Sequence, residues 1–98
     1  MTSIYKYPLG MDIHHGQTLE IMMPRGAKLL DLQMQGQIPT LWAIVNPEKE
    51  LKKYVFHVFG TGFEMTDYDK KYYDYVGTIQ YMTVLGGPLV WHVFRVMS

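Results

Sequence analysis

Two nearly repeated stretches, Val55-Phe56-His57-Val58-Phe59 and Leu89-Val90-Trp91-His92-Val93-Phe94, decide the fold of this chain. Each places β-branched and aromatic residues at successive positions, which is the pattern of a strand covered on both faces. Each also carries one histidine at the same place in the pattern. We therefore expect both stretches to be central strands around which the core forms.

Alternation and turn residues on either side of these stretches predict the other strands. The predicted strands span residues 4–9, 18–23, 27–35, 38–45, 54–59, 75–85 and 89–96. Pro8 removes a backbone donor and places the first strand at a sheet edge, and Gly77 indicates a bulge in a long strand. Asn46 to Lys53 predicts one short helical turn, with a capping asparagine, a proline at the first helical position and acids before lysines.

Six to seven strands joined by short turns, without any βαβ unit, predict an all-β fold. We expect one β domain over residues 1–98, a small antiparallel sandwich or barrel. The hairpin at Gly36 has two registers: a two-residue loop pairs Asp31 with Trp42, and a three-residue loop pairs Leu30 with Trp42. We favour the second, because it buries the large indole beside Leu30.

Composition limits the classes of function. Lysine plus arginine and aspartate plus glutamate total 9 each, so no long-range field attracts nucleic acid or anionic lipid. The chain has no cysteine, which excludes disulfides and thiolate sites and suits a reducing cytosol. No leader-like N-terminus and no apolar run of about 18 residues are present, so we expect a soluble, cytoplasmic protein with no membrane or nucleic-acid partner.

Four histidines, His14, His15, His57 and His92, together with Asp12, are the only obvious source of metal ligands. Their spacing is poor for a zinc site, so we expect no metal. We expect His57 and His92 to be packed, and close together if the two repeated stretches pair in register. We expect His14 and His15 to be solvated.

Catalytic motifs are absent from the sequence. The carboxylates lie in predicted loops or on wet faces without an obvious pair, and no G-x-S-x-G element occurs. Gly60-Thr61-Gly62 is not followed by a helix start and is interpreted as a strand-end turn rather than a phosphate loop. We expect a protein that is not an enzyme and needs no cofactor.

A tyrosine-rich segment between residues 63 and 74 is the best candidate for a contact surface. Tyrosine buries a large area at low entropic cost and keeps a polar tip, so it is common at protein interfaces. The predicted partner-binding residues are Tyr68, Lys70, Lys71, Tyr72 and Tyr73. The alternative is a lid folded over one end of the domain.

Several short blocks resemble, in this order, a family of small tailed-phage and prophage proteins. The blocks are Ile4-Tyr5-Lys6-Tyr7-Pro8-Leu9, Met23-Pro24-Arg25-Gly26-Ala27, Leu41-Trp42-Ala43-Ile44-Val45, Gly60-Thr61-Gly62, Val76-Gly77-Thr78 and Leu89-Val90-Trp91-His92-Val93-Phe94. The resemblance implies a phage origin and a role in the host bacterial cytoplasm. It implies no activity, cofactor or catalytic residue.

Three functions fit the sequence. The leading one is a binding protein that contacts a host or phage protein and inhibits a host defence factor. The first alternative sequesters a small ligand, such as a nucleotide signal, where Arg25, Lys28 and Arg95 converge. The second is a structural or virion-associated homo-oligomer built through exposed strand edges.

Overall fold

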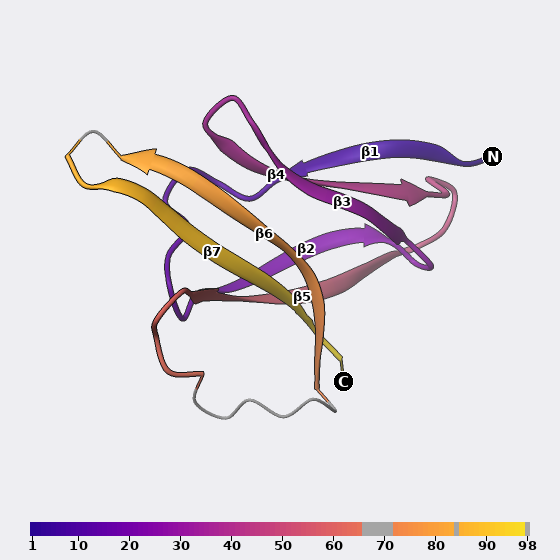
Figure 1. Cartoon of the computed structure of the whole chain (residues 1–98). Coiled ribbons are helices and arrows are strands. Elements are labelled where there is room, and N and C mark those ends of the chain that lie inside the picture. The colour runs from indigo at the N-terminus through magenta and orange to yellow at the C-terminus, as the bar shows by residue number, and fades with distance from the viewer. Residues whose placement is uncertain (66–71, 84, 98) are drawn as a thin grey trace.

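Seven antiparallel strands form two stacked sheets in the computed structural model, which describes residues 1–65, 72–83 and 85–97. The strands are β1 (Ser3–Pro8), β2 (Thr18–Pro24), β3 (Lys28–Gln35), β4 (Ile38–Val45), β5 (Leu51–Gly60), β6 (Tyr73–Thr83) and β7 (Gly87–Val96). One sheet has the order β1-β4-β3 and the other β2-β5-β7-β6. The all-β fold is confirmed, and its two separate sheets make it a sandwich (Figure 1).

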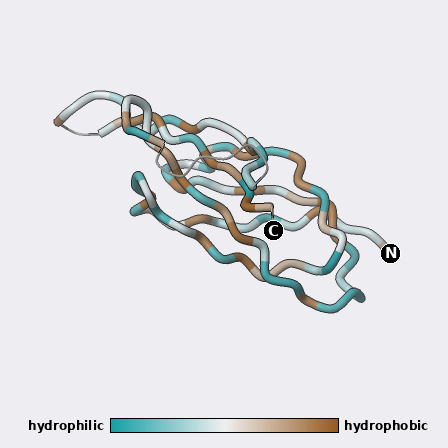
Figure 2. The backbone as a smooth tube through the Cα atoms, turned by 90° about the horizontal axis from the view of Figure 1, so that it is seen from below, coloured by the Kyte–Doolittle hydropathy of each residue, from teal (hydrophilic) through white to brown (hydrophobic). Residues whose placement is uncertain are grey.

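The molecule is flat and elongated, as the view from below in Figure 2 shows. Its Cα atoms span 45 × 32 × 16 Å, and the short dimension fits two sheets stacked about 10 Å apart. Buried side chains from both sheets fill the space between the layers. They include Met23, Leu32, Leu41, Ala43, Val45, Tyr54, Phe56, Val58, Ile79, Trp91 and Val93. Nowhere in the described ranges does a helix of membrane-spanning length and hydropathy occur.

The two repeated stretches are the central strands β5 and β7 of the four-stranded sheet, as predicted. They pair with each other, but with an offset: His57 lies opposite Phe94, and Phe59 lies opposite His92. The two histidines therefore share one face of the sheet without being direct partners. Phe56 and Val58 alternate with them and point into the core.

The predicted register of the β3–β4 hairpin is wrong. A two-residue turn at Gly36 and Gln37 connects the strands, and Gly36 takes the left-handed φ of 63°. Asp31, not Leu30, lies opposite Trp42. Trp42 is half-buried on the outer face of the three-stranded sheet rather than inside.

A β-bulge explains why the core tolerates this register. Leu30 is the extra residue of β3, because Leu29 pairs with Ala43 whereas Asp31 already pairs with Trp42. Leu29 and Leu32 then both face the core, although they are three positions apart. The simple alternation used for the prediction does not include such an insertion.

The predicted helical turn over residues 46–53 is also wrong. The Asn46 carbonyl accepts the Lys49 N–H at 3.0 Å, and its side chain accepts the Glu48 N–H at 3.1 Å, so the segment is a tight turn. Strand β5 begins at Leu51 and pairs with Pro24 of β2. A one-turn helix gains little stability of its own, whereas extending β5 adds ladder hydrogen bonds and a 2.9 Å ion pair between Lys53 and Glu20.

The edges of the two sheets approach each other where β3 faces β6. The predicted irregularity of the long strand is confirmed, because the register of β6 shifts between Tyr75 and Gly77. A side chain at Gly77 would place its Cβ only 3.2 Å from the Cβ of Leu32. The missing side chain lets the two edge strands come close.

Candidate functional site

Aromatic and imidazole rings cover the outer face of the four-stranded sheet, on the side away from the core. We call this surface the aromatic face; its rings are His15, His57, Phe59, Phe63, Tyr73, Tyr75 and Phe94. In a two-layer sandwich the outer side of a sheet is usually polar. In β5 and β7, one set of alternating side chains fills the core, and the other set, which includes His57, Phe59 and Phe94, faces away from the other sheet.

Phe59 is the centre of the aromatic face. Its ring centroid lies 4.7 Å from that of His57, 5.6 Å from Phe94 and 5.7 Å from Tyr73. The rings of Phe94 and Tyr73 meet Phe59 at 77°, the edge-to-face geometry that aromatic pairs favour. Phe59 is only 4% exposed although it lies outside the main core. The centre of this face is thus packed and rigid.

The loop before β2 brings His15 onto the same surface. The Gly16 N–H donates to the Val58 carbonyl at 2.8 Å, which extends the β2–β5 ladder into the loop. The His15 ring stacks on Phe63 with centroids 4.3 Å apart, and its Nδ1 accepts the Gly60 N–H at 3.0 Å. The prediction that His15 is solvated is wrong, whereas His14 is exposed.

A chain of polar groups runs beside the rings. The Tyr75 hydroxyl contacts Thr78 Oγ1 at 2.5 Å, Thr78 Oγ1 contacts His92 Nδ1 at 2.9 Å, and His92 Nε2 contacts Thr61 Oγ1 at 2.7 Å. The bulge in β6 allows Tyr75 and Thr78 to reach this face together, although they are three residues apart. Hydroxyl groups thus contact both nitrogens of His92, which fixes the orientation of its ring.

The surroundings of His57 favour its neutral form. Burial lowers the pKa of His57 from its usual value of 6.5, and the electrostatic interaction with His15 lowers this pKa further. Its Nδ1 lies 3.1 Å from Thr18 Oγ1. An aromatic environment with one hydroxyl partner suits an uncharged imidazole.

The histidines do not converge on a metal site in the described part of the chain, where no three histidine or carboxylate groups lie close enough to hold an ion. His14 Nδ1 lies 3.2 Å from the Asp12 carbonyl. His15, His57 and His92 use ring nitrogens for the backbone or hydroxyl contacts described above.

Of the predicted partner-binding residues, Tyr68, Lys70 and Lys71 lie outside the described residues. Tyr72 is exposed just before β6, and its carbonyl accepts the Met97 N–H. Tyr73 belongs to the aromatic face. Tyr75, which stands in the same tyrosine-rich part of the sequence, also lies on the aromatic face. The sequence prediction missed Phe63, although the two-sided aromatic pattern of β5 and β7 was a signal that the second side of this sheet would be apolar.

The predicted convergence of three cations is only partly correct. Arg25 pairs with Glu50 at 3.0 Å in the turn after β2. Lys28 and Arg95 do line one cavity, between β3 and β6.

Comparison with known proteins gives one match. The model of a family described as a domain of unknown function (DUF7352) matches residues 1–98. No curated protein and no solved structure matches the chain.

Proposed function

Because the chain belongs to the DUF7352 family, a domain of unknown function, we propose a function from the surface itself: a non-enzymatic protein that binds another protein through its aromatic face. The observation that carries this proposal is the packed ring cluster around Phe59 on the outer side of a sheet. The sequence resemblance to phage proteins leads us to propose a host factor as the partner, with inhibition as the outcome.

Exposed aromatic side chains at the border of this cluster supply the contact area. Phe63, Tyr72 and Tyr75 are 56%, 55% and 58% exposed. Tyr75 packs against Phe94 with centroids 5.5 Å apart, and Phe63 stacks on His15, so both rings are held in place before binding. Pre-ordered aromatic side chains lose little entropy on association and are frequent among the residues that dominate binding energy.

The chemistry of the polar chain supports binding rather than catalysis. His92 has a threonine hydroxyl on each nitrogen, and no carboxylate in the described residues orients it as a general base. Contacts of this kind hold a surface in shape. They do not by themselves activate a nucleophile.

The test compares the double variant Tyr72→Ala/Tyr75→Ala with the control Tyr5→Ala, which removes an exposed tyrosine from the other sheet. Tagged proteins are used to capture partners from bacterial host extract, and each captured protein is then purified and titrated by calorimetry. We expect the double variant to lose roughly tenfold or more in affinity, because exposed aromatic anchors are typical hot spots, while Tyr5→Ala binds normally. Equal affinities of all three proteins would contradict the proposal.

A second candidate, a homo-oligomer, is favoured by the tip of the β6–β7 hairpin. Met82 and Leu85 are 79% and 98% exposed there, and no charged residue occurs between Val76 and Val93. Exposed apolar surface without charge favours self-association. Light scattering of the purified protein distinguishes this candidate, since it measures the subunit number directly.

A further inference from the structure

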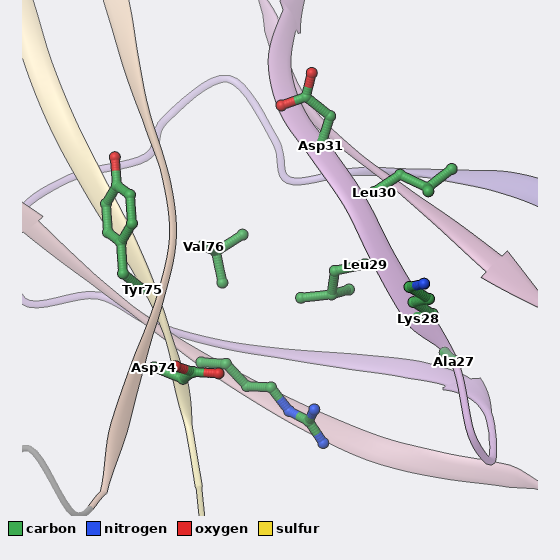
Figure 3. Close-up of a pocket in the computed structure, with 9 residues that line it drawn as sticks. Ala27, Lys28, Leu29, Leu30, Asp31, Asp74, Tyr75 and Val76 are labelled. Atoms are coloured by element: carbon green, nitrogen blue, oxygen red, sulfur yellow. The ribbon is translucent and has the colours of Figure 1, made fainter.

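A cavity of about 370 Å³ opens where the edge strands β3 and β6 face each other. Its lining includes Leu29, Leu30 and Val76, so both β-bulges of the fold border the same space. Figure 3 shows Leu29 and Val76 pointing toward each other across the gap, whereas Tyr75 points away on the other side of β6. Bulges in edge strands often occur beside binding sites, and this volume is in the range of small-molecule pockets, about 300–1,000 Å³.

Two cations and two carboxylates line this cavity. Lys28 and Arg95 line it, and within the described ranges neither forms an ion pair. The Arg95 guanidinium lies 4.8 Å from the centre of the Tyr54 ring, and Lys52 Nζ lies 5.5 Å from the same centre. Arg95 and Lys52 also line an adjoining hollow of about 180 Å³. With Lys52 counted, the basic groups at this end outnumber the carboxylates Asp31 and Asp74 of the cavity by one.

The ring of Tyr54 holds this arrangement in place. Its hydroxyl accepts the N–H groups of Gly26 and Ala27, both at 3.2 Å, and contacts the Pro24 carbonyl at 3.4 Å. Tyr54 is itself buried. The aromatic surface on which Arg95 rests is thus anchored to the β2–β3 turn.

The two carboxylates of the cavity differ in their availability. Asp31 accepts the Leu32 N–H at 2.8 Å and the Gln33 side-chain amide at 2.7 Å, so β3 already satisfies both of its oxygens. Asp74 lies on β6 opposite Arg95 in the strand register, is exposed and has no ion pair among the described residues. Asp74 is therefore free to accept a hydrogen bond from a donor group of a ligand, such as a hydroxyl.

We infer that this cavity binds a small phosphorylated molecule with hydroxyl groups, the chemistry shared by sugar phosphates and nucleotides. The phosphate lies between Lys28 and Arg95, where charge-assisted hydrogen bonds are strong. A hydroxyl of the ligand donates to Asp74. The site is on the inter-sheet edge and adjoins the aromatic face at Tyr75, whose ring points away from the cavity.

The experiment is an NMR titration of ¹⁵N-labelled protein at low salt with three probes: inorganic phosphate, ribose and ribose 5-phosphate. We expect shifts centred on residues 28–31, 74–76 and 95, with ribose 5-phosphate binding more tightly than phosphate and ribose not binding. Titration with a nucleoside monophosphate then distinguishes nucleotides from sugar phosphates as the ligand class. If it binds more tightly than ribose 5-phosphate, the ligand is a nucleotide; if it binds equally tightly, the ligand is a sugar phosphate. Failure of all phosphorylated probes to shift these residues overturns the inference.

Variants localise the site. Lys28→Gln changes an exposed side chain and should weaken ribose 5-phosphate binding roughly three- to tenfold, and Arg95→Gln more strongly, because each removes a charged hydrogen-bond donor. Asp74→Asn should reduce the preference for ribose 5-phosphate over phosphate. Lys49→Gln, which removes one positive charge from the β4–β5 turn, is the control and should bind as the wild type does. Equal weakening by Lys28→Gln and Lys49→Gln would show charge attraction only and would refute the site.

Discussion

Gly60 is the position where one added methyl group should cost most. A Cβ built there lies 2.6 Å from Cζ3 of Trp91 and 2.8 Å from Cδ2 of Phe63, whereas non-bonded carbon atoms prefer about 3.5–4.0 Å. Phe63 lies at the surface and is packed by His15, whereas Trp91 is buried among core residues, so the overlap with Trp91 is the harder one to relieve. Overpacking of this kind costs roughly 1–3 kcal/mol, and we expect Gly60→Ala to lie at the upper end.

The assay is urea unfolding followed by far-ultraviolet circular dichroism, with Gly77→Ala as the matched control. At Gly77 the new Cβ lies 3.2 Å from Leu32, which is a smaller overlap. Alanine also restricts the unfolded chain more than glycine does, which stabilises the folded state by roughly 0.5–1 kcal/mol. These two effects oppose each other, so the net change in the free energy of unfolding should be near zero. For a domain of this size, about 2 kcal/mol also lowers the melting temperature by roughly 8–16 °C. A Gly60→Ala protein within about 0.5 kcal/mol of the wild type would show that Trp91 is not fixed, and would refute the reasoning.

Two further predictions concern single side chains. Lowering the pH below 6.5 should reduce the free energy of unfolding. The pKa of His57 is lowered in the folded state, so the unfolded chain binds the proton first as the pH falls. The stabilisation that His57 gives is complete above pH 6.5, and its loss levels off below the folded pKa. The slope should not exceed about 1.4 kcal/mol per pH unit for this proton, and a series of urea titrations from pH 8 to 5 should be flatter for His57→Gln than for the wild type; identical slopes would contradict the assignment. Tyr54→Phe should cost about 0.5–1.5 kcal/mol in urea unfolding, because the Gly26 N–H loses its acceptor whereas the Ala27 N–H keeps the Pro24 carbonyl at 3.1 Å. Tyr7→Phe is its control, since no described group hydrogen-bonds the Tyr7 hydroxyl, and an equal loss in both variants would show that the contacts of Tyr54 do not matter.

The sequence predicted the strands well because their signals are local. Alternation located β2, the β-branched aromatic repeats located β5 and β7, and Pro8 correctly placed β1 at an edge. The hairpin register failed because a bulge at Leu30 adds one residue, and no local pattern announces it. The helical turn failed because pairing of residues 51–53 with β2 outweighs a weak capping signal.

The candidate site was less predictable, because it depends on which strands pair. Phe59 and Phe94 become neighbours only through the β5–β7 offset, and His15 joins them only when its loop extends the β2 ladder. The sequence predicted that Lys28 and Arg95 converge. It did not predict that Arg95 and Lys52 lie over the Tyr54 ring, because this depends on how the strands that carry these residues are arranged. Residue types alone carry none of this information.

The close contact between Gly77 and Leu32 also has a consequence for solubility. From Val76 to Thr83, strand β6 carries no charged side chain, and a long uncharged edge strand is a template for aggregation. The bulge interrupts the flat edge, and β3, the edge strand of the other sheet, lies close to it. The same paired irregularities that border the cavity should thus disfavour edge-to-edge association.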